Sequence, residues 1–241
     1  PETLKRIERF LSLQKAGNAE GRMAIHFTSR NAPKICVLLD DLDDIDLADT
    51  HVITGFSAMD VFREGNRKWN NDTVMAVVKA NAYGHGLVET AEHLEKVGID
   101  FLMVGKLQEA LLLREKGISA PILNFGPFSH EYSEEIIKNN ISQSVFTEEV
   151  TELSRASLGL GKKAKVQINI DTGMGRMGIS YREALPYIET VSSLKGISIE
   201  GISTTLTEDD DFDREQPSRF LSLCQAAEKR GIPVGLKHAA S

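Results

Sequence analysis

Cysteine is scarce in this sequence, whose 241 residues contain only Cys36 and Cys224. Two thiols this far apart cannot form the disulfide framework of a small secreted domain, so we expect a reducing compartment, the cytoplasm. Long apolar runs are also absent, and none approaches the roughly 20 residues that a membrane-spanning helix needs. The first residues, Pro1 to Lys5, lack the apolar centre of a signal peptide. We therefore predict a cytoplasmic protein with no membrane partner.

Basic residues are fewer than acidic ones: the sequence has 28 Lys and Arg residues and 35 Asp and Glu residues, which gives a net charge of -7. Such a chain is repelled by a phosphate backbone, which predicts no nucleic acid partner. Residues 40–49 are rich in aspartate, but they lack the central glycine and final glutamate of a calcium loop. No cluster of His, Cys and carboxylates has zinc spacing. We expect a solvated acidic loop there and no metal site.

Strand and helix patterns alternate regularly from Val74 onward. Buried-strand patterns recur at 74–78, 101–104, 121–123, 143–146, 164–170, 197–203 and 234–238. Helical patterns separate these strands, at 87–97, 107–116, 131–139, 181–194 and 214–230. A further helix is expected from Thr147, which we predict as its N-cap. This cadence of βα units predicts an α/β fold, a (β/α)8 TIM-type barrel.

The predicted barrel is incomplete, because a closed barrel of this type needs eight strands and residues 74–241 contain seven strand patterns. Either residues 34–39, an apolar run, close the sheet, or the chain stops inside the barrel at its C-terminal end; we favour the second reading. We divide the sequence into an N-terminal segment, 1–73, with no assigned role, and a barrel domain, 74–241.

Residues 75–86 (MAVVKANAYGHG) are the most informative stretch. Four apolar residues without alternation are typical of a parallel strand buried on both faces, and Lys79 follows them directly. A turn of small residues with two glycines and Tyr83 comes next, and apolar residues at helical spacing begin at Leu87. Sites in α/β folds lie at the carboxyl ends of strands, so this pattern presents Lys79 where a site is built.

Apolar surroundings make an ammonium harder to keep charged, which lowers the pKa of a lysine and favours nucleophilic attack on carbonyls. Lys79 is therefore a candidate for Schiff-base chemistry. The alternative is that Lys79 ends a strand as an ordinary solvated charge.

Residues 168–178 (INIDTGMGRMG) hold Gly173, Gly175 and Gly178 in G-x-G-x-x-G spacing, with Glu200 about twenty residues later. Dinucleotide binding by this motif requires a helix that begins inside the glycine run, so that its amides face the pyrophosphate. Here Ser180 and Glu183 have the spacing of a capping box, which predicts a helix that starts after the last glycine. This pattern disfavours a nicotinamide site.

Both stretches resemble motifs of the alanine racemase family. MAVVKANAYGHG is similar, residue for residue, to that family's pyridoxal-phosphate lysine motif, and DTGMGRMG to its second signature. Weaker similarity continues at 201–205 and 237–241, so the resemblance covers about Val74 to the end. It implies a barrel-bearing isomerase that uses pyridoxal 5'-phosphate to convert L-alanine to D-alanine, a cell-wall precursor. It also implies a small amino-acid substrate and a homodimer.

The same resemblance assigns roles to individual residues. Lys79 would bind the cofactor covalently and exchange a proton at the substrate Cα, and Tyr83 would hydrogen-bond the cofactor phosphate. Arg176 would donate to the cofactor's phenolic oxygen and help to orient the substrate carboxylate. The alternatives are an ion pair between Arg176 and a neighbouring acid and a packing role for Tyr83. His85 could be a base, but a structural loop histidine is the commoner role.

Two positions depart from the commonest family pattern. Asn169 stands where many members carry a carbamylated lysine that buttresses the arginine, and Thr205 stands where the family usually has a histidine. The family's second acid/base, a tyrosine of a partner subunit's C-terminal domain, would lie beyond Ser241. We therefore expect the 241-residue chain alone to be inactive. A non-catalytic pyridoxal-phosphate-binding barrel, a racemase of serine or another amino acid, and a decarboxylase on the same barrel are the alternatives.

Overall fold

The computed structural model describes residues 21–28, 32–39, 50–54, 73–96, 98–207, 209 and 212–240. The first two described strands, β1 (Gly21–Thr28) and β2 (Ala32–Leu39), pair antiparallel in a sheet of their own. Residues 34–39 are therefore a strand, as expected, but the idea that they close the main sheet is wrong. Pairing with a strand that lies close in the sequence closes a short loop, which costs less conformational entropy than joining a distant sheet edge.

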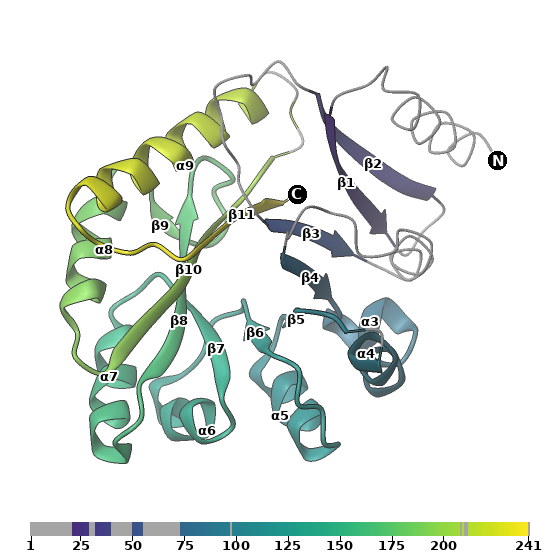
Figure 1. The fold of residues 1–241 in the computed structure, drawn as a ribbon, viewed down its shortest axis with the longest axis horizontal. Coiled ribbons are helices and arrows are strands. Elements are labelled where there is room, and N and C mark those ends of the chain that lie inside the picture. Colours follow the sequence, from purple (N-terminus) through teal and green to yellow (C-terminus); the bar gives the residue numbers. More distant parts are fainter. Residues whose placement is uncertain are drawn as a thin grey trace.

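The main sheet is built from parallel strands (Figure 1). In spatial order they are β3 (Thr50–Thr54), β4 (Thr73–Val77), β5 (Phe101–Val104), β6 (Ile122–Asn124), β7 (Ile141–Val145), β8 (Ala164–Asp171), β10 (Ile197–Thr205) and β11 (Leu236–Ala240). A short strand, β9 (Ile179–Ser180), pairs with β8 beside this path. The sheet curls, and its edge strands β3 and β11 bring Cα atoms within 8 Å of each other. No backbone pairing joins these two edges within the described ranges, so the barrel is not closed.

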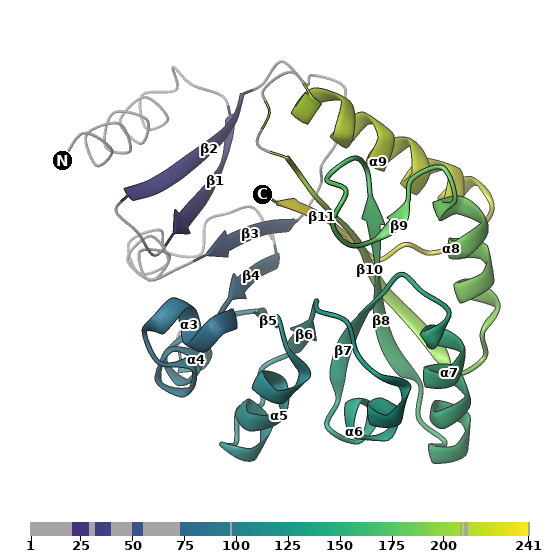
Figure 2. The same cartoon turned by 180° about the vertical axis from the view of Figure 1, so that it is seen from behind.

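Helices cover the outer side of the curled sheet, and the strands face inward (Figure 1 and Figure 2). They are α4 (Leu87–Lys96), α5 (Leu107–Glu115), the 3-10 turn η1 (His130–Tyr132), α6 (Ser133–Lys138), α7 (Glu149–Leu160), α8 (Ala184–Ser193) and α9 (Phe212–Lys229). None of the helices in these ranges is both long and apolar enough to cross a bilayer.

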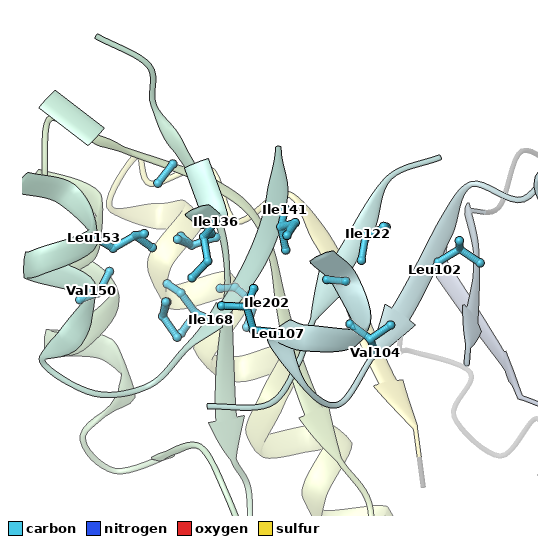
Figure 3. Close-up of a cluster of buried hydrophobic side chains, with 14 of the residues drawn as sticks. Leu102, Val104, Leu107, Ile122, Ile136, Ile141, Val150, Leu153, Ile168 and Ile202 are labelled. Carbon is cyan, nitrogen blue, oxygen red and sulfur yellow. The ribbon is translucent and has the colours of Figure 1, made fainter. Parts of the chain in front are cut away.

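Alternate residues of each strand serve the two faces of the sheet. Ala76 and Val78 belong to the large cluster between the sheet and the helices, whereas Met75 and Val77 belong to a smaller cluster inside the barrel. Figure 3 shows the large cluster, where strand residues such as Ile122 and Ile168 meet helix residues such as Leu153. Burial on both faces explains why the strands read as continuous apolar runs.

Each strand and helix pattern predicted from Val74 onward overlaps an element of the expected type, with bounds that differ by up to three residues. Two predicted caps are wrong. Helix α7 begins at Glu149 with Glu148 as its N-cap, because the Thr147 hydroxyl bonds the Glu149 carboxylate instead of a helix amide. Ser180 forms no capping box with Glu183, because it is extended in β9 opposite Asp171. The acidic stretch 40–49 lies outside the described residues.

Candidate active site

Lys79 follows the buried end of β4, where Val78 donates its N–H to the carbonyl of Met103 at 2.8 Å. Its aliphatic stem crosses the backbone of Gly105, since a Cβ built on that glycine would lie 3.4 Å from the Cβ of Lys79. The lysine Nζ lies 5.2 Å from the ring centroid of Phe125. The lysine is thus half-buried among apolar groups, an arrangement that favours the site reading over a solvated strand end.

The electrostatic surroundings of Lys79 lower its pKa below the ordinary value. Burial is the largest cause, the positive charge of Arg176 adds to it, and the carboxylate of Glu109 opposes both. A lowered pKa raises the fraction of neutral amine at a given pH, which is the nucleophilic form.

A left-handed helical turn, α3 (Lys79–Gly84), follows the strand. Four consecutive residues that are not glycine, Ala80 to Tyr83, have φ values of 53, 57, 50 and 55°. Such a backbone costs L-residues roughly 1–2 kcal/mol each. Hydrogen bonds to side chains offset this cost: the Ala80 N–H donates to Glu109 Oε1 at 2.7 Å, and the Leu87 N–H donates to Asn81 Oδ1 at 2.8 Å. Strained backbone held by its surroundings is characteristic of functional sites.

Tyr83 lies at the end of this turn and packs against the cluster inside the barrel. Its ring centroid is 6.0 Å from Lys79 Nζ. Burial raises the pKa of the Tyr83 phenol, so the hydroxyl stays protonated at neutral pH and can donate a hydrogen bond. The tyrosine therefore faces the same space as the lysine, whether it packs only or also binds a ligand.

Arg176 lies in the loop between β8 and β9, at the same end of the sheet as Lys79. The acid nearest to it in the motif, Asp171, accepts the N–H groups of Gly173 and Gly175 at 2.9 and 3.0 Å. No carboxylate pairs with Arg176 within the described part of the chain. This geometry disfavours an ion pair on the loop and leaves the guanidinium exposed toward the barrel end.

Helix α9 holds this loop from outside through Arg219, a residue that the sequence did not single out. Its guanidinium donates to the carbonyl of Thr172 at 2.7 Å and stacks between the rings of Tyr181 and Phe212, at 4.4 and 5.0 Å from their centroids. Gly173 packs under the Phe212 ring, where an added Cβ would lie 2.4 Å from ring carbons. The G-x-G spacing in the sequence does not predict this contact between Gly173 and helix α9.

Asn169 and Thr205, the two positions that depart from the family pattern, both take part in hydrogen bonds between a side chain and the backbone. Asn169 is 8% exposed, and its Nδ2 donates to the Met177 carbonyl at 3.4 Å, next to Arg176 in the chain. The carbonyl of Thr205 accepts from Gln216 Nε2 at 3.1 Å. In this chain, therefore, the side-chain amide of Asn169 supports the backbone of the loop that carries Arg176.

The glycine run of 173–178 leads into strand β9 and not into a helix, because α8 begins only at Ala184. A Cβ on Gly178 would lie 2.7 Å from the backbone nitrogen of Asp171, so this glycine allows two strands to approach. The helix that follows this run in the sequence therefore begins after the last glycine, as predicted, so the run does not open a helix in the way that dinucleotide binding by this motif requires.

These features define a class: a parallel α/β barrel protein that presents a lysine of lowered pKa at the carboxyl end of a strand, beside a loop arginine. The family model described as "Alanine racemase, N-terminal domain" matches residues 62–241. The chain belongs to the alanine racemase family.

Individual relatives agree with this assignment. Alanine racemase 2 from Caldanaerobacter subterraneus subsp. tengcongensis is 42% identical over 174 residues, which cover 70% of this chain and 45% of that protein. Alanine racemase from Clostridium perfringens is 41% identical over 174 residues, with the same coverage. The solved alanine racemase from Clostridium difficile in complex with cycloserine superposes with a TM-score of 0.71 at 31% identity, over 78% of this chain and 54% of that one. The chain thus spans about half the length of the relatives it matches.

Proposed function

We propose that this chain is the lysine-bearing barrel part of an alanine racemase that uses pyridoxal 5'-phosphate to interconvert L- and D-alanine. The observation that carries the proposal is the placement of Lys79, with its lowered pKa, at the barrel end where Arg176 also lies. Membership of the alanine racemase family supports the reaction and the substrate.

The residues present fit the proposed cofactor. An amine of lowered pKa suits covalent attachment to an aldehyde, and the flanking ring of Phe125 suits a flat aromatic group. A protonated phenol at Tyr83 suits a phosphate oxygen. When bound, pyridoxal phosphate supplies an electron-withdrawing ring that stabilises negative charge at the substrate Cα.

The chain's own side chains then have distinct tasks. Lys79 would hold the cofactor through its Nζ; as a free neutral amine it would accept a proton from the substrate Cα, and as the resulting ammonium it would return one. Arg176 offers a planar, permanently charged fork with no competing carboxylate among the described residues, which suits the carboxylate of an amino acid.

Inversion of a stereocentre requires proton exchange on both faces of the substrate, and one lysine reaches only one face. We therefore propose that a second subunit completes the site in a homodimer, and that residues 74–241 act as the cofactor-binding domain. The scarcity of cysteine and the use of free amino acids support a cytoplasmic location.

The proposal is tested by adding pyridoxal phosphate to the purified intact protein and to its Lys79→Ala variant. We expect the visible absorbance of a lysine-bound cofactor in the wild type, with the modified peptide containing Lys79 after borohydride reduction. Lys106→Ala, which changes an exposed lysine on a neighbouring loop, is the matched control and should keep both signals. Unchanged labelling and absorbance in Lys79→Ala would reject the attachment site and the mechanism built on it.

A further inference from the structure

Glu109 is placed to connect two loops at the active-site end of the barrel. It lies in the first turn of α5, and its Oε2 accepts the N–H groups of Gly105 and Lys106 at 3.1 and 3.2 Å. Its other oxygen, Oε1, accepts the Ala80 N–H at 2.7 Å. One carboxylate therefore ties the loop after β5 to the turn that begins directly after Lys79.

Bonds to Gly105 and Lys106 alone would be an ordinary helix cap, since a glutamate at this helix position commonly accepts the amide that precedes the helix. The bond to Ala80 goes further, because this residue lies in the preceding βα unit and its φ of 53° is the first of the left-handed series. Right-handed turns are strongly preferred by alanine. The left-handed turn at Ala80 therefore depends on an acceptor from outside the turn.

The other end of the connection lies under the lysine itself. Gly105, whose N–H Glu109 holds, is the backbone over which the stem of Lys79 passes, with 3.4 Å between the Cβ of Lys79 and a Cβ built on the glycine. Gly105 in turn lies against Gly126, where an added Cβ would meet the Gly105 carbonyl oxygen at 2.0 Å. The floor beneath Lys79 is thus fixed by close backbone contacts on one side and by Glu109 on the other.

We infer that Glu109 is a positioning residue for Lys79: its carboxylate fixes the backbone on both sides of the lysine and so sets the direction in which the Nζ reaches its ligand. This role rests on the proposed function of Lys79, and it is a second task beyond capping α5. It uses both carboxylate oxygens, because Oε1 accepts the Ala80 amide while Oε2 accepts the two amides of the α5 cap.

The chain provides a matched control in Glu95. Its Oε1 accepts the N–H groups of Ser119 and Ala120, both at 2.7 Å, and the Ser119 hydroxyl at 2.8 Å. This carboxylate also ties a helix to a loop, but Ser119 and Ala120 precede β6 and therefore lie at the end of the sheet opposite to Lys79. Glu95→Gln should thus disturb the backbone to a similar degree without touching the lysine.

Two variants of Glu109 separate its reach from its charge. Glu109→Asp keeps the charge and can still cap α5, but it is one methylene too short to reach Ala80 as well. Glu109→Gln keeps the length, removes the charge and leaves one acceptor oxygen. Both variants and Glu95→Gln are compared with the wild-type intact protein, and thermal unfolding is recorded for each.

The first measurement is titration with pyridoxal phosphate, followed by visible absorbance and by the circular dichroism that the bound chromophore acquires. We expect both Glu109 variants to bind at least about tenfold more weakly and to lose most of the induced dichroism, since a hydrogen bond to a charged group is lost. Glu95→Gln should behave as the wild type. Wild-type binding and dichroism in Glu109→Asp, or an equal loss in Glu95→Gln, would overturn the inference.

The second measurement needs no cofactor: the rate at which trinitrobenzenesulfonate modifies Lys79, followed by peptide mass spectrometry across pH. The charged groups that act on the lysine are Arg176 and Glu109, with the Tyr83 phenol beside it. Because the Glu109 carboxylate raises the pKa of Lys79, we expect the midpoint of the curve of modification rate against pH to move to lower pH in Glu109→Gln. In Glu109→Asp, which keeps the charge, this midpoint should stay near that of the wild type. An unmoved midpoint in Glu109→Gln contradicts the contact. If pyridoxal phosphate fails to bind the wild type, the proposed function fails, whereas this measurement still tests the contact between Glu109 and the lysine's loop.

Discussion

Asp171 accepts the backbone N–H of Gly175 through both carboxylate oxygens, each at 3.0 Å. The same carboxylate accepts the N–H of Gly173 at 2.9 Å. The aspartate at the end of β8 therefore shapes the loop that carries Arg176, and its negative charge is satisfied by amides instead of by the guanidinium. An aspartate in the signature DTGMGR thus acts on the arginine through the backbone.

Removal of this carboxylate should loosen the loop. We expect Asp171→Ala to lower the free energy of unfolding by about 2 kcal/mol, because hydrogen bonds to a charged acceptor are lost. Urea unfolding followed by far-ultraviolet circular dichroism measures this change. Glu152→Gln is the control, because Glu152 pairs with Arg155 on an exposed helix face and surface pairs contribute little. Equal effects in the two variants would contradict the assigned role.

Gly173 should tolerate no side chain. Its φ of 144° and the Phe212 ring carbons 2.4 Å from a built Cβ predict that Gly173→Ala destabilises the protein by about 2 kcal/mol or more. Gly159, inside helix α7 with nothing within 4 Å of its built Cβ, is the matched glycine. Gly159→Ala should stabilise by about 0.5–1 kcal/mol, since alanine is the better helix former. Thermal unfolding of both variants should show a lower melting temperature than the wild type for Gly173→Ala and a higher one for Gly159→Ala.

Buried His238 should make folding sensitive to acid. Its ring Nε2 lies 2.6 Å from Gln167 Oε1, and burial lowers the pKa of His238 to about 4. The unfolded state then binds more protons than the folded state between pH 6.5 and about 4, so stability is full above pH 6.5 and falls as the pH drops through that window. We expect a loss on the order of 3 kcal/mol across it.

His238→Gln should flatten the dependence of the free energy of unfolding on pH, because glutamine keeps a hydrogen-bonding amide but cannot titrate. His130→Gln, which changes an exposed histidine in η1, serves as the control. Urea unfolding at a series of pH values measures the free energy of unfolding of the wild type and of both variants. A wild-type slope that persists in His238→Gln would assign the acid sensitivity to other groups.

Local sequence patterns were sufficient for most of the barrel but not for its active-site backbone. The run from Met75 to Val78 predicts a buried strand because its side chains face helices on one side and the barrel interior on the other. The left-handed turn after this strand could not be predicted, because alanine and tyrosine prefer a right-handed backbone. The hydrogen bond that stabilises the turn comes from Glu109, which belongs to the next βα unit. Glu109 itself reads as an ordinary acid in a first helical turn.

The edge of the sheet shows the same limit. Strand β3, Thr50–Thr54, is short and carries polar residues at both ends, so its sequence was not recognised as a strand. Its place in the sheet is set by pairing with β4. The loop of Arg176 was located from its motif, whereas Arg219 was missed because stacking between Tyr181 and Phe212 joins segments that are distant in the sequence. The sequence therefore predicted features that lie within one helix or strand, but not the contacts between side chains of different elements.

The charge of Arg176 should control the reactivity of Lys79. Because the guanidinium contributes to the lowered pKa of Lys79, removal of that charge in Arg176→Gln should raise the pKa. The neutral amine is then scarcer at a given pH, and the rate of trinitrobenzenesulfonate modification at Lys79 should fall near pH 8 and reach its plateau only at higher pH. Arg182→Gln removes an exposed arginine that stacks on Tyr181, 5.1 Å from its ring centroid, and should leave the profile unchanged. A profile that shifts equally in both variants would reflect net charge alone, whereas a shift confined to Arg176→Gln places the guanidinium and the amine in one shared site.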